Sequence, residues 1–210
     1  MIKNERARRS SFGQAGSLTP VDRIGVWLSG RRLRREIGDV TGKDVGDFGC
    51  GFQAMQARRL LPDVANMTLV DVALNKELLE DPRVRMIEGE LPEVLAGVAD
   101  QSLDVVLCIS VLEHLWDPET ALSEFKRILR PGGVCFINVP TWLGKRFLEF
   151  SAFRLGLSPV EEMDDHKTYY DPKDLWPLLV KVGFQPHAIR CGRHKLGLNC
   201  YAACKAEATA

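Results

Sequence analysis

The sequence has 210 residues, of which 45% are hydrophobic and 27% are charged, values that are ordinary for a globular protein of one domain. Its 28 basic residues balance its 28 acidic residues, which argues against a nucleic-acid-binding protein with a broad basic surface. No stretch approaches the ~18 apolar residues of a membrane span, and the N-terminus lacks the apolar core of a secretory signal. We therefore expect a cytoplasmic protein with no transmembrane segment and no nucleic-acid partner.

Six cysteines are scattered along the chain, which suits a reducing compartment. Four residues that are close in sequence form a candidate zinc site: Cys191, His194, Cys200 and Cys204. The spacings match no common zinc pattern, and the segment around them alternates like a strand. We therefore expect no metal.

The first 42 residues precede the main alternation of strands and helices. Residues 1–18 are polar and contain Gly and Ser, which predicts a poorly ordered tail. A helix is predicted from Pro20, which suits a first helical position, to near Gly38, which suits a helix end. Its expected apolar stripe consists of Ile24, Trp27 and Leu28. We interpret residues 1–42 as a tail and a cap helix.

Short apolar segments then alternate with helical ones. Strands are predicted in the segments "DVGDFG", "MTLVDV", "VRMIEG", "LDVVLCIS" and "GGVCFINV", and helices in "FQAMQARRLL", "NKELLED" and "PETALSEFKRILR". Strands that alternate with helices imply crossover connections and a parallel sheet. The continuous apolar runs indicate strands that are covered on both faces.

The alternation of strands and helices is interrupted after Pro140. An aromatic segment and an acidic loop form an expected insert over residues 141–171, and a helix with Pro177 inside it follows. Two last strands, "QPHAIRCG" and "KLGLNCYAACKA", are joined by so few residues that they must be antiparallel. The predicted fold is α/β: a seven-stranded, mostly parallel sheet with helices on both faces and a C-terminal antiparallel hairpin, formed by residues 43–210.

The segment "DFGCG" places two glycines, Gly49 and Gly51, where the first strand meets its helix. Glycines at such a junction allow a ligand to approach the backbone amides. Asp71 ends the next strand, a position where a carboxylate typically holds the two hydroxyls of a ribose. Asp47, just before the glycines, is a poor neighbour for pyrophosphate and a good one for an ammonium group. The pattern favours a nucleoside that carries a positive charge.

At these residues the chain resembles the class I S-adenosylmethionine-dependent methyltransferases, whose glycine motif reads D-x-G-x-G. Four further segments match the small-molecule, type 11-like group in order: "LVD" at 69–71, "EGELP" at 88–92, the run from "LDVVLCIS" through "EHL" to "LRPGG", and the late "H…Y…L…GF" segment. Many members have a third glycine where this chain has Gln53. The resemblance covers about residues 43–205 and implies a Rossmann-like methyltransferase fold.

The resemblance also implies S-adenosyl-L-methionine as cofactor and S-adenosyl-L-homocysteine as product. The residues that it assigns to the cofactor are Asp47, Gly49, Cys50, Gly51, Asp71, Val72, Glu90, Leu91, Ile109 and Ser110. Asp47 would face the ammonium group, Asp71 the ribose, and Glu90 the adenine edge. For the apolar residues in this set, core packing is the alternative interpretation.

Methyl transfer to a hydroxyl needs a general base, and the chain has four histidines. His114 follows the fourth parallel strand, where an acceptor would meet the methyl group, and His166 lies in the acidic loop. Both are candidate catalytic residues; packing in their loops is the alternative role. His187 and His194 belong to the terminal strands, away from the cofactor, and we interpret them as structural.

The sequence therefore predicts methyl transfer from S-adenosylmethionine to an oxygen atom of a small-molecule acceptor. A sugar or glycolipid precursor, a quinone-like lipid or another metabolite would each fit. Two alternatives remain: a non-catalytic relative that binds the cofactor or a partner protein, and an NAD-dependent oxidoreductase on a similar sheet. The oligomeric state is not predicted.

Overall fold

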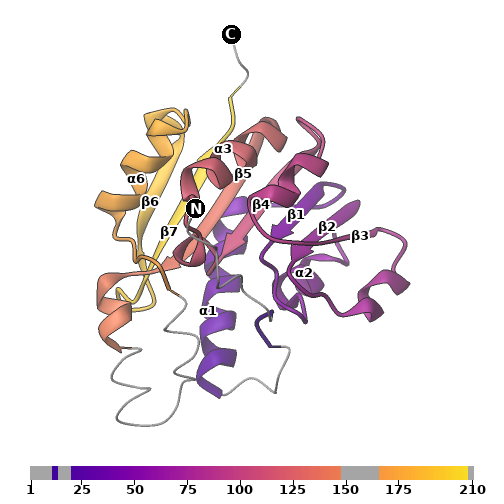
Figure 1. The fold of residues 1–210 in the computed structure, drawn as a ribbon, viewed down its shortest axis with the longest axis horizontal. Coiled ribbons are helices and arrows are strands. Elements are labelled where there is room, and N and C mark those ends of the chain that lie inside the picture. Colours follow the sequence, from indigo (N-terminus) through magenta and orange to yellow (C-terminus); the bar gives the residue numbers. More distant parts are fainter. Residues whose placement is uncertain (1–10, 14–19, 148–165, 208–210) are drawn as a thin grey trace, which may run out of the picture.

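The computed structural model describes residues 11–13, 20–147 and 166–207, and its centre is a seven-stranded sheet (Figure 1). The sheet order is β3-β2-β1-β4-β5-β7-β6. The strands are β1 Asp44–Phe48, β2 Asn66–Asp71, β3 Val84–Glu88, β4 Leu103–Ile109, β5 Leu129–Pro140, β6 Ile189–His194 and β7 Asn199–Lys205. The neighbouring strands β1 to β5 pair in parallel, whereas β7 is antiparallel to both β5 and β6. The predicted fold class is confirmed.

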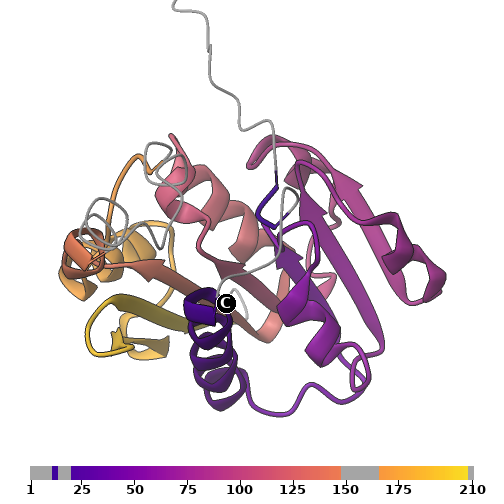
Figure 2. The same ribbon diagram turned by 90° about the horizontal axis from the view of Figure 1, so that it is seen from below.

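Helices cover both faces of this sheet (Figure 2). The helices with described bounds are α1 Pro20–Ile37, α2 Met55–Leu60, α3 Pro118–Ile128 and α6 Pro172–Lys181, with short 3-10 turns at Lys76–Glu80, Glu93–Gly97, Leu112–His114 and Pro186–Ala188. One buried cluster joins the sheet to α3 and α6 through residues such as Phe125 and Leu175. The other joins it to α1 and α2 through residues such as Leu33 and Leu60. The two-sided cover explains why the central strands are apolar along their whole length.

Several elements differ in extent from their predictions. The segment "NKELLED" forms a 3-10 turn whose start is fixed by Asn75, since its side chain accepts a hydrogen bond from the Glu77 amide. The last-but-one strand starts only at Ile189, after a turn that begins with Pro186. Helix α6 continues past Pro177 to its end, so this proline does not terminate it. Residues 142–147 are helical as expected.

The predicted apolar stripe of the N-terminal helix is wrong for two of its members. Ile24 and Trp27 are 60% and 53% exposed, and the residues of α1 that enter the core are Leu33 and Ile37 in its last turns. Only the C-terminal part of α1 packs on the sheet in this way. In the part of the chain that the structure describes, no helix is both long and apolar enough to cross a bilayer.

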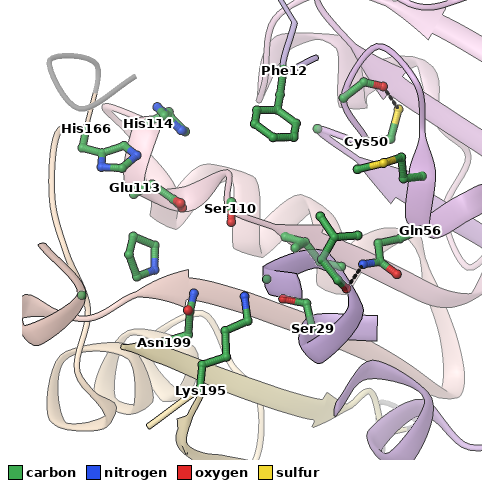
Figure 3. A pocket seen from close by; sticks show the side chains of 18 of the residues that line it. Phe12, Ser29, Cys50, Gln56, Ser110, Glu113, His114, His166, Lys195 and Asn199 are labelled. Carbon is green, nitrogen blue, oxygen red and sulfur yellow. Dashed lines mark hydrogen bonds between the residues drawn. The ribbon is translucent and has the colours of Figure 1, made fainter. Parts of the chain in front are cut away.

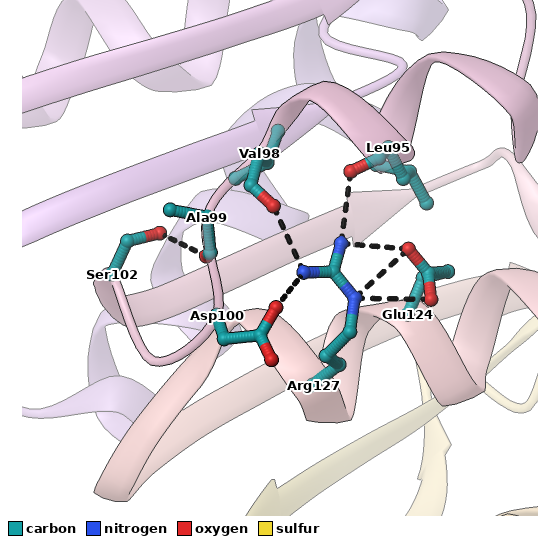
Figure 4. A network of polar contacts seen from close by, with 7 residues as sticks. All are labelled: Leu95, Val98, Ala99, Asp100, Ser102, Glu124 and Arg127. Atoms are coloured by element: carbon teal, nitrogen blue, oxygen red, sulfur yellow. Dashed lines mark hydrogen bonds and ion pairs between the residues drawn. The ribbon is translucent and has the colours of Figure 1, made fainter.

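Arg127, near the end of α3, ties this helix to the loop that precedes β4 (Figure 4). Its guanidinium donates to the backbone oxygens of Leu95 and Val98 at 2.9 Å each. It also forms ion pairs with Glu124, one turn earlier in α3, and with Asp100 in the loop. Because one planar group contacts four partners in a fixed geometry, it holds the helix and the loop in register.

Candidate active site

A cavity of about 340 Å³ opens at the carboxyl ends of the parallel strands, where ligands bind in sheets of this type (Figure 3). Most residues that the sequence assigned to the site line it. They are Asp47, Gly49, Cys50, Gly51, Asp71, Ile109, Ser110, His114 and His166. One cavity thus spans the glycine turn and both candidate catalytic histidines, although these segments are far apart in the sequence.

The first glycine is required by packing as well as by the turn. Gly49 has a φ of 75°, and a Cβ atom built on it would lie 2.2 Å from a methyl carbon of Val111. The amides of Gly49 and Cys50 both donate to the backbone oxygen of Val70, which ties the turn to β2. Burial and the nearby carboxylates of Asp47 and Asp71 raise the pKa of the Cys50 thiol, so Cys50 is not an activated nucleophile.

The second glycine is held by the carboxylate at the end of β2. One oxygen of Asp71 accepts a hydrogen bond from the Gly51 amide at 2.8 Å, and the other accepts from the amide of Val72 at 2.8 Å. Gly51 also has a left-handed φ of 74°. Phe12 packs beside this turn, and its backbone oxygen accepts from the Phe52 amide at 2.9 Å. The residues that surround the glycine turn therefore include Phe12, which was predicted to belong to the N-terminal tail.

Asp47 lies beneath the turn and is 2% exposed. Burial is the main cause that raises its pKa to about 7, and the charge of Asp71 adds to the effect. The backbone amide of Ala57 acts in the opposite direction. Two carboxylates that face one cavity create a negative end, and such an end fits an ammonium group or another cation.

Three residues assigned to the cofactor do not line the cavity. Val72 follows Asp71 directly, Glu90 is exposed, and Leu91 packs against the core. Their contact with an adenine ring stays a prediction. Ser110 does line the cavity, with a left-handed φ of 57°, and its amide donates to the Asn138 backbone oxygen at 2.7 Å. This bond fixes the end of β4 against β5.

Glu113, His114 and His166 form the other end of the cavity (Figure 3). The backbone oxygen of Glu113 accepts from the amides of Lys167 and Thr168, which brings the distant 166–168 segment to the end of β4. The rings of His114 and His166 are 4.7 Å apart between centroids. His166 Nδ1 is 2.9 Å from the Tyr169 hydroxyl, which orients the imidazole.

These three side chains are also close enough to be considered as metal ligands. One ligand atom from each of Glu113, His114 and His166 lies within 4.8 Å of the others, and Glu113 is 1% exposed. Two imidazoles and a carboxylate suit several divalent cations. The candidate zinc site weighed from the sequence was a different group, which contains His194. In that group His194 Nε2 is instead 2.5 Å from the Asn138 side-chain oxygen.

Helix α1 contributes cavity residues that sequence reasoning missed. Gly25 and Ser29 line the cavity and lie four residues apart, on one face of the helix. The Gln56 side chain donates to the Val26 backbone oxygen at 2.8 Å, which holds α1 over the site. The four-residue spacing of the small residues Gly25 and Ser29 was the sequence signal that could have indicated a cavity-facing side of this helix. Trp27, from the predicted apolar stripe of this helix, is exposed and is not among the cavity-lining residues.

The 141–171 insert is described only in part. Phe147 lines the cavity, and Trp142 packs on Tyr169 with ring centroids 5.5 Å apart. Phe150 and Phe153, in the aromatic segment of this insert, lie outside the described residues.

The terminal hairpin requires a correction. His187 and His194 were predicted to lie with the terminal strands away from the cofactor, yet Lys195, Leu198 and Asn199, which follow His194 directly, line the cavity. The reason is the direction of β7: it is antiparallel to β5, and Asn199 at its start pairs with Pro140 at the end of β5. The hairpin turn therefore lies at the same edge as the ends of the parallel strands.

Comparisons with known proteins agree with this geometry. Residues 46–137 match a family described as "Methyltransferase domain". A probable S-adenosylmethionine-dependent methyltransferase of Mycolicibacterium smegmatis is 38% identical over 106 residues, which are 47% of this chain and 38% of that protein. A ubiquinone biosynthesis O-methyltransferase of Klebsiella pneumoniae is 30% identical over 141 residues, 63% of this chain and 57% of that protein. These alignments span roughly two-fifths to three-fifths of the relatives' lengths.

A solved structure of an S-adenosylmethionine-dependent methyltransferase from Archaeoglobus fulgidus has the same fold. Its TM-score is 0.63 at 16% identity, and the match covers 85% of this chain and 93% of that one. The fold is therefore that of the S-adenosylmethionine-dependent methyltransferases to which the chain is similar. The segment from the middle of β1 into β5 carries the matched methyltransferase domain.

Proposed function

We propose that this protein transfers the methyl group of S-adenosylmethionine to a hydroxyl oxygen of a small-molecule acceptor. The observation that supports this most directly is the single cavity that joins the Gly49–Gly51 turn and Asp71 to the group Glu113, His114 and His166. When bound, S-adenosylmethionine supplies a methyl group already activated by a sulfonium. The protein has to bind the two reactants, align them and accept a proton.

The cofactor end of the cavity fits the charge and shape of S-adenosylmethionine. Asp47 and Asp71 give this end a negative potential, which suits the ammonium and sulfonium groups. Each Asp71 oxygen accepts one backbone amide at 2.8 Å and keeps lone-pair capacity for a ribose hydroxyl. The same negative end disfavours the pyrophosphate of NAD, so the oxidoreductase alternative is weaker.

The acceptor end provides candidate proton acceptors. His166 is oriented by the Tyr169 hydroxyl at 2.9 Å, and the His114 ring lies edge-on to it. In our proposal one of these imidazoles takes the hydroxyl proton as the acceptor oxygen attacks the methyl carbon. The balance of acidic and basic residues in the chain supports a small-molecule acceptor over a nucleic acid. Because the Klebsiella relative is a ubiquinone biosynthesis O-methyltransferase, a hydroxylated quinone-like ring is the first acceptor class to test.

The test has two stages. Calorimetry with S-adenosylhomocysteine and with NAD separates a methyltransferase from an oxidoreductase. Release of S-adenosylhomocysteine is then measured with hydroxylated aromatic and saccharide acceptors. Good cofactor binding without product above background, across the whole acceptor panel, would favour the non-catalytic alternative.

A further inference from the structure

The turn between β6 and β7 carries a lysine into the cavity. It is a tight turn from His194 to Gly197, and the Gly197 amide donates to the His194 backbone oxygen at 3.1 Å. The Thr141 hydroxyl donates to the Gly197 backbone oxygen at 2.7 Å, and the Thr141 amide donates to that of Leu198 at 3.0 Å. These bonds fix the turn to the end of β5. Lys195 is the cationic side chain that the turn places in the cavity (Figure 3).

The backbone of this turn is unusual for its sequence. Lys195 and Leu196 both have left-handed φ values, 51° and 57°. Hairpin turns with two such residues strongly favour Asn, Asp and Gly, because other side chains are strained there. Leu196 is 98% exposed, so packing of this side chain does not account for the conformation. This backbone conformation places the Lys195 side chain in the cavity.

The Lys195 side chain is half-buried in the cavity wall. It lies beside α1, where a Cβ atom on Gly25 would be 3.9 Å from Nζ. In the part of the chain that the structure describes, no hydrogen bond or ion pair of Lys195 is found, and the nearby carboxylate that acts on it is Glu113. Burial lowers its pKa to about 8, so most molecules still carry the charge at neutral pH. A buried cation is costly unless an anion joins it.

We propose that Lys195 binds an oxyanion, a carboxylate or a phosphate, that the acceptor carries in addition to its methylated hydroxyl. This inference rests on the proposed function, because it assumes that an acceptor occupies this cavity. Its location supports the acceptor rather than the cofactor, because its turn is bonded to Thr141 after the end of β5, whereas most residues assigned to the cofactor lie at the ends of β1, β2 and β4. The carboxylate of the cofactor itself is the other possible source of the anion, and the experiment has to separate the two.

Binding of small probes tests the proposal without turnover. The protein is saturated with S-adenosylhomocysteine and titrated by calorimetry with 4-hydroxybenzoate, phenyl phosphate and neutral 4-hydroxybenzyl alcohol. We expect at least one anionic probe to bind about tenfold or more tightly than the alcohol, as a charge-assisted hydrogen bond would produce. Lys195→Met should remove this difference, whereas Lys205→Met, at an exposed lysine in β7, should preserve it.

A second variant guards against a purely structural effect. Lys195→Asn introduces a residue type that adopts left-handed φ readily, and it removes the charge from the cavity. We expect it to raise the unfolding temperature while it loses the preference for the anionic probe. If Lys195 only stabilised the fold, Lys195→Asn would lower the unfolding temperature.

Three results would overturn the proposal. The first is equal binding of anionic and neutral probes by the unmodified protein, or no binding of any anionic probe. The second is an anion preference that survives in Lys195→Met. The third is a loss of S-adenosylhomocysteine affinity in Lys195→Met with the probe preference intact, which would assign the lysine to the cofactor carboxylate. Because these measurements need no turnover, they are independent of whether methyl transfer to oxygen is demonstrated.

Discussion

The carboxylate of Asp71, at the end of β2, holds the backbone amide of Gly51 at 2.8 Å, so one side chain both shapes the glycine turn and faces the cavity. The two residues are twenty positions apart in the sequence, and the parallel pairing of β1 with β2 brings them together.

The first prediction concerns Asp71. Asp71→Ala should weaken binding of S-adenosylhomocysteine by roughly tenfold to a hundredfold, because a hydrogen bond to a charged group contributes about 1.5–3 kcal/mol. Calorimetry measures this change, and Asp71→Asn, which keeps one oxygen, should lose less. Glu93→Ala, at an exposed carboxylate away from the cavity, is the control. Unchanged affinity in Asp71→Ala would contradict the proposed cofactor site.

The second prediction is a pH dependence that arises from Asp47, whose pKa is raised to about 7. Below that pH the cofactor-free protein holds a proton that an ammonium ligand would displace. Affinity for S-adenosylhomocysteine should therefore rise as the pH increases from about 6 to about 8. Asp47→Asn should bind more weakly and lose this contribution to the pH dependence. A titration series in both proteins checks the result.

Asp47 also has the opposite effect on the stability of the cofactor-free protein. The native state keeps this proton up to about pH 7, whereas the unfolded chain releases it near pH 3.8, the ordinary value. Its contribution to the free energy of unfolding is therefore full below pH 3.8 and is lost as the pH rises to about 7. The free energy of unfolding of Asp47→Asn, minus that of the unmodified protein, should therefore be more positive at pH 8 than at pH 5. Denaturant unfolding at the two pH values measures the difference.

The third prediction concerns the histidines at the acceptor end. His114→Ala and His166→Ala should both retain S-adenosylhomocysteine binding. The variant that lacks the general base should lose about 10²- to 10⁴-fold in kcat, the range for such a group. Tyr169→Phe should lower kcat less, because it removes only the 2.9 Å bond that orients His166. Initial rates with a saturating acceptor provide the measurement, and full activity in both histidine variants would exclude the proposed base.

Removal of divalent cations separates proton transfer from metal chemistry at the same group. Because the ligand atoms of Glu113, His114 and His166 lie within 4.8 Å of one another, the geometry alone allows either role. With an imidazole as base, a chelator should leave the rate unchanged. A rate that falls on chelation and returns with added Mg²⁺ or Mn²⁺ would assign these residues to a metal instead.

The fourth prediction tests why position 49 is glycine. Gly49→Ala should be strongly destabilising, because the new methyl group would meet Val111 and because φ is 75°. The double variant Gly49→Ala, Val111→Ala should recover part of this loss, since the space is relieved but the backbone strain is not. Thermal unfolding of the single and double variants measures the coupling. No recovery would mean that the backbone conformation alone requires the glycine.

The fifth prediction concerns the Arg127 network that joins α3 to the 95–100 loop. Arg127→Met keeps the stem but removes the hydrogen bonds to the backbone oxygens of Leu95 and Val98. We expect a loss of about 1–3 kcal/mol in the free energy of unfolding. Arg85→Met, which removes a single 3.2 Å bond from an exposed arginine, should lose less than about 0.5 kcal/mol. Equal effects of both substitutions would show that the network adds no stability.

Sequence patterns were enough to predict the class of fold and the cofactor end of the site. Buried parallel strands are continuous apolar runs, and the turn residues Gly49, Gly51 and Asp71 lie at strand ends that local patterns identify. Helical segments that separate the strands leave few topologies other than a parallel sheet. Local patterns mark each of these strand ends, and parallel strands bring their carboxyl ends to one edge, so spacing along the chain was sufficient to predict them.

The residues around the proposed acceptor end could not be predicted without the tertiary structure. Lys195 and Asn199 enter the cavity because β7 is inserted antiparallel between β5 and β6. His166 reaches His114 because the backbone oxygen of Glu113 accepts the amide of Lys167, 54 positions later (167 − 113). Such contacts depend on the order and register of distant strands and loops. The physical reason is that periodicity along a chain reports which side of an element is buried, but not which other element covers it.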